Sequence, residues 1–220
     1  MDDIGPKVML PDELIRRSRS LMAMVRDQAE EAERNRCISA DTIKAMRTAG
    51  LFRSLQPAKY GGFEHDFTTL TDIAVEIGRG CGSSAWVFTN LAEQNWINGM
   101  KDDRVQQEVW GDDPDTFIAS SFQGPGSTAV RDDGGFRVDG TWSFSSGVDH
   151  VSWNNLQIFV PNDHGARDHY FALVPRSDFE IIDDWFPSGL AGTGSKSIVV
   201  KDVFIPNYRA KLRNLSRIVI

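Results

Sequence analysis

The sequence contains few cysteines and few histidines. Among its 220 residues there are two cysteines and four histidines. Cys37 and Cys81 form no Cys-x-x-Cys pair, and the histidines lack the spacing of a metal-binding motif. The sequence therefore argues against both a disulfide scaffold and a metal site. Both cysteines are interpreted as small buried hydrophobic side chains.

Positive charge and long apolar runs are also scarce. The 24 basic residues are outnumbered by 31 acidic ones, which gives a formal net charge of −7. A chain this acidic does not attract phosphate backbones, so no nucleic-acid partner is expected. The apolar runs are too short to span a bilayer, and the first residues, MDDIGPKVML, lack an apolar signal-peptide core. The sequence predicts a cytoplasmic protein with no membrane partner.

The first half of the sequence has the 3.6-residue period of amphipathic helices. Leu14, Leu21 and Val25, for example, recur on one face of the first segment. Helices are expected over residues 11–34, 39–52, 67–80, 83–100 and 102–111. Together they predict an N-terminal α-helical domain over residues 8–112.

After Pro114 the period falls to two. Short β-rich runs alternate with turns rich in Gly, Asp, Asn and Pro. Strands this closely spaced predict a compact barrel or sandwich over residues 115–208. The predicted fold class is therefore α+β and multidomain, with a helical domain followed by a β-barrel. Residues 211–220 fit neither pattern and are interpreted as a separate tail.

Two serine-rich segments carry the candidate chemistry: IASSFQGPGST (118–128) and TWSFSSG (141–147). Strand alternation places Phe144 and Ser146 on one face and Ser145 on the other. A flavin requires an aromatic or apolar wall together with hydroxyl and backbone hydrogen-bonding groups. On composition alone, ordinary turn chemistry is the favoured explanation of these serines.

Other catalytic motifs are incomplete. GSSAW and FSSG do not match the nucleophile elbow of hydrolases, and GPGST lacks the lysine of a phosphate-binding loop. GLAGTG lies between predicted strands instead of opening a helix, which argues against a dinucleotide-binding motif.

Five segments, in order along the chain, resemble the acyl-CoA dehydrogenase superfamily. They are LQPAKYGGFE, GRGCGSSAWV, FIASSFQGPGSTAV, VDGTWSFSSGVDH and GLAGTGSKSIVVKDVFIP. Within that superfamily the sequence is most similar to oxygenase components of two-component flavin-dependent monooxygenases, of the 4-hydroxyphenylacetate and secosteroid hydroxylase type. The resemblance implies reduced FMN or FAD as cofactor, O2 as co-substrate and a small aromatic substrate. It also implies a separate flavin reductase and a homo-oligomer, usually a tetramer.

The resemblance also implies roles for individual residues. The flavin-binding positions are Ser120, Ser121, Gly126, Ser127, Phe144, Ser145 and Ser146. The catalytic positions are Trp86, Gln94, Ser145 and Ser146. Phenol hydroxylases of this group carry a histidine where this chain has Gln94, and glutamine cannot act as a base at neutral pH.

The C-terminal four-helix bundle of the family has no counterpart in this sequence, whose family-like pattern stops near Ala210. This implies a truncated chain that exposes an apolar face and self-associates. Two alternatives stay open: an acyl-CoA dehydrogenase-type FAD enzyme, and a non-catalytic remnant or partner-binding fragment.

Overall fold

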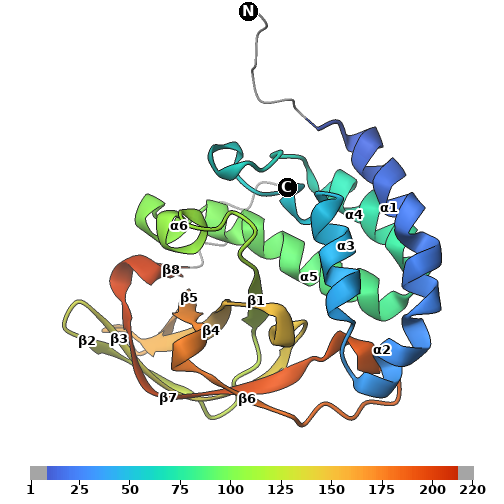
Figure 1. Cartoon of the computed structure of the whole chain (residues 1–220). Coiled ribbons are helices and arrows are strands. Elements are labelled where there is room, and N and C mark those ends of the chain that lie inside the picture. The colour runs from blue at the N-terminus through green and yellow to red at the C-terminus, as the bar shows by residue number, and fades with distance from the viewer. Residues whose placement is uncertain (1–8, 213–220) are drawn as a thin grey trace, which may run out of the picture.

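The helical half of the protein forms one layer in a computed structural model that describes residues 9–212 (Figure 1). Its α-helices are α1 (Pro11–Asp27), α2 (Ala29–Asn35), α3 (Ala40–Thr48), α4 (Phe67–Gly78), α5 (Gly82–Gly99) and α6 (Asp103–Trp110). The first expected helix is divided in two at Gln28. The Gln28 Oε1 atom accepts hydrogen bonds from the hydroxyls of Ser39 and Thr42, which ties the break to the start of α3.

Helix starts follow the capping chemistry of the sequence in part. The Ser39 hydroxyl accepts a hydrogen bond from the backbone N–H of Thr42 at 3.0 Å, and Asp66 caps α4 in the same way. α5 begins at Gly82, one residue before the expected start, and Ser83 and Ser84 lie buried in its first turn. The Ser83 hydroxyl donates a hydrogen bond to the Glu33 carboxylate of α2, and no side chain caps the start of α5.

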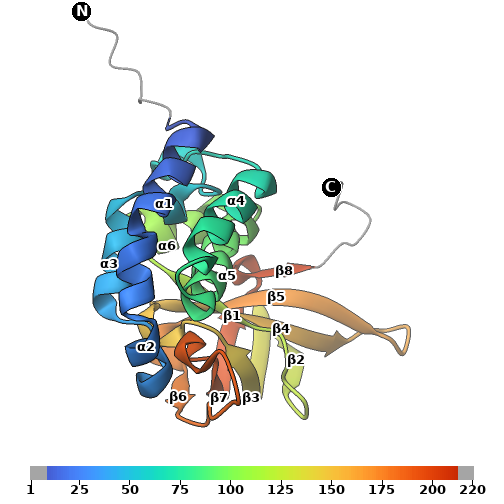
Figure 2. The same ribbon diagram turned by 90° about the vertical axis from the view of Figure 1, so that its right-hand side faces the viewer.

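The strands form two four-stranded sheets (Figure 2). One has the order β1 (Ile118–Ser121), β4 (Trp153–Pro161), β5 (Arg167–Pro175) and β8 (Ala210–Leu212). The other has the order β2 (Thr128–Asp132), β3 (Gly135–Ser145), β7 (Lys196–Pro206) and β6 (Glu180–Ile182). Only β1 and β4 pair in parallel. The helix-then-strand order is confirmed, whereas the β-barrel is not, because residues 9–212 form two sheets and no closed barrel.

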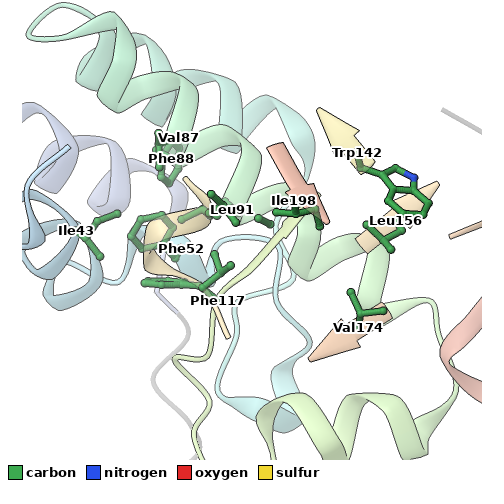
Figure 3. Packing of buried hydrophobic residues seen from close by; sticks show 14 of the residues in the cluster. Ile43, Phe52, Val87, Phe88, Leu91, Phe117, Trp142, Leu156, Val174 and Ile198 are labelled. Carbon is green, nitrogen blue, oxygen red and sulfur yellow. The ribbon is translucent and has the colours of Figure 1, made fainter. Parts of the chain in front are cut away.

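One continuous apolar core joins the helices to both sheets (Figure 3). Phe52 stacks at a tilt on Phe88 of α5 and on Phe117 next to β1, with centroid separations of 5.6 and 4.6 Å. Trp142 of β3 and Leu156 of β4 are fully buried in the same cluster. The helical and β portions therefore pack as a single unit, and α5 lies between them.

The last sheet strand extends past the expected end of the β domain. Lys211 and Leu212 belong to β8, where Lys211 pairs with Phe171 of β5. The sheet therefore continues through Leu212, the last residue that the structure describes. The rest of the proposed tail, residues 213–220, lies outside the described residues.

Candidate functional site

A cavity of about 480 Å³ opens where α5, the end of β3 and the segment before β7 meet. This volume is within the range of small-molecule sites. The cavity is lined by Trp86, Asn90, Glu93, Ser120, Phe122, Gln123, Phe144, Ser146, Trp185, Gly189, Leu190, Thr193 and Ser195. Trp86 and Phe144 are each 52% exposed despite their size, because both border this open space.

A break in strand β3 turns Phe144 into the cavity. Its φ angle is +63°, a left-handed conformation that is uncommon for an aromatic residue. The β3–β7 register shifts between Trp142 and Ser145 at the same place, as in a β-bulge. Phe144 meets Trp185 edge-on, with centroids 5.8 Å apart. The bulge therefore places a strained aromatic side chain on the cavity wall.

Ser146 is held by a directed series of hydroxyl hydrogen bonds. Its Oγ accepts from Trp86 Nε1 at 2.9 Å and lies 2.8 Å from Ser195 Oγ, which lies 2.8 Å from Thr193 Oγ1. Thr193 donates its single proton to the Leu190 carbonyl at 2.8 Å. Ser195 must therefore donate to Thr193, and Ser146 to Ser195, because each hydroxyl has one proton. Ser146 is left with a lone pair and presents an acceptor to the cavity.

The structure brings four of the candidate residues to this cavity: Trp86, Ser120, Phe144 and Ser146. Ser145 points away and accepts a hydrogen bond from Asn154 Nδ2 at 2.6 Å. The Ser121 hydroxyl is fully buried and has no hydrogen-bond partner in the described part of the protein. Gln94 is also fully buried and does not line the cavity.

Gly126 and Ser127 border a second hollow, which adjoins the cavity through Gln123. The glycines of this turn have local explanations. A Cβ on Gly124 would lie 2.5 Å from the Trp142 ring, and Gly126 has a φ of +79°. The Ser127 hydroxyl donates to the Gly124 carbonyl at 2.6 Å. Packing and turn geometry therefore account for these residues without a ligand.

Sequence reasoning missed Glu93 and Asn90, which share the cavity face of α5 with Trp86. In a helix, a residue seven positions on returns to within about 20° of the first, whereas one eight positions on is about 80° away. Glu93 therefore faces the same way as Trp86, and Gln94 does not. This spacing was a usable signal in the sequence. Ser195 and Thr193, by contrast, reach the site only through tertiary folding.

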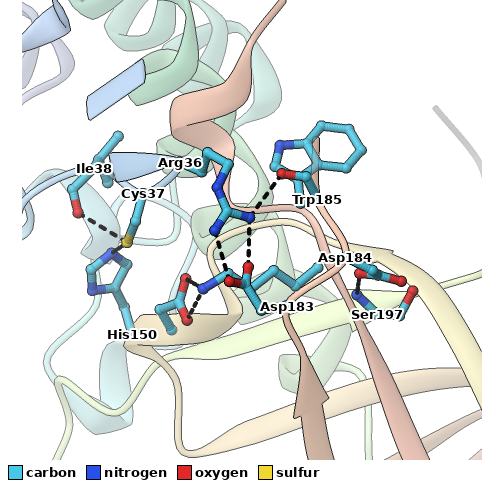
Figure 4. A network of polar contacts seen from close by, with 10 residues as sticks. Arg36, Cys37, Ile38, His150, Asp183, Asp184, Trp185 and Ser197 are labelled. Atoms are coloured by element: carbon cyan, nitrogen blue, oxygen red, sulfur yellow. Dashed lines mark hydrogen bonds and ion pairs between the residues drawn. The ribbon is translucent and has the colours of Figure 1, made fainter. Parts of the chain in front are cut away.

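Polar contacts anchor the segment that carries Trp185 (Figure 4). Arg36 forms a two-pronged ion pair with Asp183 at 2.6 and 2.7 Å and donates to the Trp185 carbonyl at 3.1 Å. Next to this pair, Cys37 lies 3.4 Å from His150. Burial raises the pKa of Cys37 to about 12 and lowers the pKa of His150. Burial therefore favours the protonated thiol, and the Arg36 contacts hold one wall of the cavity in place.

A second anchor involves Glu33 of α2. Its carboxylate accepts hydrogen bonds from the backbone N–H groups of Ala191 and Gly192, at 2.8 and 3.0 Å, and from the Ser83 hydroxyl at 2.5 Å. Burial acts to raise the pKa of Glu33, but these three donors outweigh it and leave the pKa lowered. The loop before Thr193 is thereby fixed to the helical layer.

Within residues 9–212, no group of three or more His, Cys, Asp or Glu side chains could hold a metal ion. None of the helices described there is both long and apolar enough to cross a membrane. Glu93 is the one ionisable side chain among the described residues that line the cavity.

Comparison with known proteins identifies the fold and family. Residues 14–104 match the model of the acyl-CoA dehydrogenase N-terminal domain. The chain is 40% identical over 190 residues to the flavin-dependent monooxygenase oxygenase subunit HsaA of Mycobacterium tuberculosis, covering 86% of this chain and 48% of that protein. It is 34% identical to the FADH(2)-dependent resorcinol hydroxylase oxygenase component of a Rhizobium species, covering 89% and 48%.

Solved structures agree. The HsaA crystal structure superposes with a TM-score of 0.89 at 38% identity, covering 93% of this chain and 53% of that one. XiaF from Streptomyces, solved with FADH2 and glycerol, superposes with a TM-score of 0.85 at 30% identity, covering 94% of this chain and 52% of that one. The chain is therefore a member of the acyl-CoA dehydrogenase-like family. Its homologues within that class are oxygenase components of flavin-dependent monooxygenases, and it spans about half the length of these curated relatives.

Proposed function

We propose that the cavity binds a reduced flavin, FMN or FAD, and that the chain contributes to an oxygenase that hydroxylates a small aromatic substrate with O2. A separate reductase would supply the reduced flavin. The observation that carries the proposal is the Trp86–Ser146 hydrogen bond beside Phe144. It sets an oriented hydroxyl next to an exposed aromatic wall, in the half of the protein that its monooxygenase relatives share.

The residues present fit a flavin. Phe144 and Trp185 offer apolar ring surfaces for a flat heterocycle. Ser146 offers an acceptor lone pair, which suits a ring N–H that reduced flavin has and oxidised flavin lacks. When bound, the flavin supplies the redox chemistry with O2. The chain's own residues bind it, orient it and exclude water from one side.

Apolar exposure supports a proposal of oligomerisation. Leu190, Trp86 and Phe144 line the cavity and are exposed, and Phe186, next in the chain to the cavity-lining Trp185, is 73% exposed. We call these four residues the apolar rim. Several large apolar side chains exposed near one cavity are typical of a surface that other protein covers. We therefore propose a homo-oligomer. A cytoplasmic location stays a prediction from the sequence.

Anaerobic titration with flavin tests the proposal. We expect reduced FMN or FAD to bind more tightly than its oxidised form, and Ser146→Ala to weaken that binding by about fivefold, equivalent to one hydrogen bond. Tight binding of oxidised FAD with an acyl-CoA-induced spectral change would instead favour the dehydrogenase alternative. Absence of any flavin binding would favour the non-catalytic fragment.

Turnover is a separate measurement. With a flavin reductase, NADH, O2 and resorcinol, we expect a hydroxylated product in the presence of the chain. Hydrogen peroxide alone, formed at the rate of the reductase without the chain, would contradict the proposed activity.

A further inference from the structure

A network of four side chains joins a buried lysine to the cavity. Lys101 Nζ donates to Asn155 Oδ1 at 2.5 Å, and Asn155 Nδ2 donates to Gln94 Oε1 at 2.7 Å. Gln94 Nε2 in turn donates to Glu93 Oε1 at 3.4 Å. Lys101, Asn155 and Gln94 are buried, whereas Glu93 is half-buried and reaches the cavity. We call these four residues the amide network.

The direction of the amide network follows from donor and acceptor chemistry. An ammonium group only donates, so Asn155 must turn its oxygen toward Lys101. Its amide nitrogen then faces Gln94, which must present its own oxygen. That leaves the Gln94 nitrogen directed at Glu93. Every hydrogen bond therefore runs from the lysine to the carboxylate, and bonds aligned in this way polarise and strengthen one another.

At the two ends of the network, Lys101 is buried and Glu93 is half-buried, and neither forms an ion pair within residues 9–212. Burial lowers the pKa of Lys101 to about 7, and burial alone accounts for it. Burial raises the pKa of Glu93, and the hydrogen bond from Gln94 opposes the rise. No other titratable group contributes to either shift. The charged form of Glu93 stabilises the charged form of Lys101, and the reverse, because the aligned side-chain amides couple the two groups.

A purely structural explanation is that the network fills the interface between α5 and β4. It would account for Asn155 and Gln94, which are buried and form a hydrogen bond with each other. It does not account for an acid on the cavity wall at one end. Nor does it account for an interior lysine that has no carboxylate partner within residues 9–212, because such a charge destabilises the fold.

We propose that Glu93 accepts a hydrogen bond from the ring hydroxyl of the aromatic substrate, and that Lys101 is a positioning residue that acts on Glu93 through Asn155 and Gln94. The proposal rests on the proposed function for its substrate, a phenol. It assigns the polar substrate contact to Glu93 in place of the neighbouring Gln94. The role of Gln94 is to pass the polarisation of the lysine to the carboxylate.

Carboxyl NMR tests the coupling without flavin or turnover. The Glu93 carboxyl carbon is followed against pH in the wild type, in Lys101→Met and in Asn155→Leu. We expect the pKa of Glu93 to rise by about one pH unit in both variants, because each interrupts the network that polarises the Gln94 donor. Lys44→Met is the matched control, since Lys44 is exposed on α3 and removes the same charge. It should leave the Glu93 titration unchanged.

An unchanged Glu93 titration in the folded variants would overturn the proposed coupling. If Lys101→Met fails to fold, Glu93→Gln provides the reciprocal measurement. It removes the anion at the cavity end, so the pKa of Lys101, followed at its Cε carbon, should fall further. A constant Lys101 titration would contradict the proposal equally well.

Ligand binding tests the substrate contact. Resorcinol and its dimethyl ether have the same ring, but only resorcinol has hydroxyl donors. We expect the wild type to prefer resorcinol, and Glu93→Gln to reduce that preference by about tenfold. If reduced flavin binds while the preference is unchanged by Glu93→Gln, the inference fails and the proposed function stands. If neither flavin nor resorcinol binds, the proposed function fails, whereas the NMR coupling is judged on its own result.

Discussion

Trp86 Nε1 donates a hydrogen bond to Ser146 Oγ at 2.9 Å, and this contact joins helix α5 to the end of strand β3. The proton order of the hydroxyls behind it is set at the other end of the series, where Thr193 donates to the Leu190 carbonyl. Because Ser146 donates onward to Ser195, its remaining capacity toward the cavity is that of an acceptor. The indole N–H and the hydroxyl series together determine which kind of ligand group Ser146 can receive.

Ser195→Ala should reduce the preference for reduced over oxidised flavin. Without the Ser195 oxygen, the proton of Ser146 is free to turn into the cavity, so the hydroxyl becomes a donor as well as an acceptor. We expect the ratio of the two dissociation constants to fall by about fivefold. Anaerobic and aerobic titrations measure the ratio, with the exposed Ser177→Ala as control. An unchanged ratio would mean that the order of the hydroxyl protons does not control the preference for reduced over oxidised flavin.

Phe144→Gly should raise stability while weakening flavin binding. Glycine adopts a φ of +63° without strain, so the free energy of unfolding should increase by about 1 kcal/mol. The half-exposed ring contributes little burial but forms a wall of the cavity. Urea denaturation measures the stability. Ser143→Gly, in the same strand and not at a positive φ, should destabilise instead. Loss of stability in Phe144→Gly would show that its ring contacts outweigh the strain.

Lys101→Met should remove a pH dependence of stability. The lysine has a pKa of about 7 in the folded protein and 10.5 as its ordinary value, so between these pH values the unfolded chain binds more protons. Wild-type stability therefore rises with pH across this window, at up to about 1.4 kcal/mol per pH unit. At neutral pH, the stability gained by removing the buried charge is offset by about 1–3 kcal/mol, because the Asn155 oxygen loses its hydrogen-bond donor.

The change of slope, not the value at one pH, is therefore the decisive measurement for Lys101. Urea denaturation at about pH 7 and about pH 9 should show a smaller rise in Lys101→Met than in the wild type. Lys44→Met should keep the wild-type rise. Equal slopes in all three proteins would mean that Lys101 is not held in a low-pKa environment.

The apolar rim around the cavity should promote self-association. We expect the isolated chain to bind a hydrophobic dye and to elute as a concentration-dependent oligomer in gel filtration. Phe186→Ser should reduce both, because Phe186 is the most exposed large apolar side chain in the described part of the protein. Phe204→Ser, on a half-exposed residue of β7, is a suitable control. A monomer without dye binding would contradict this expectation.

The sequence by itself determined the local elements, because periodicity and capping act over a few residues. It separated helices from strands near Pro114, and strand alternation predicted that Phe144 and Ser146 share a face, whereas the bulge at Phe144 depends on pairing with β7. It also identified the family, since the motifs are contiguous. The family resemblance was confirmed by the homologues.

Tertiary structure decided how the elements meet. The strands form two sheets because β1 pairs with β4 and β3 with β7, across long stretches of chain that no local pattern encodes. Folding brought Ser195 to Ser146 and placed Ser121 and Ser145 in the interior. Burial of one face of α5 set its rotation, and that rotation turned Glu93 into the cavity and Gln94 toward Asn155. Residue types fixed which chemistry was possible, but only packing selected the atoms that face a ligand.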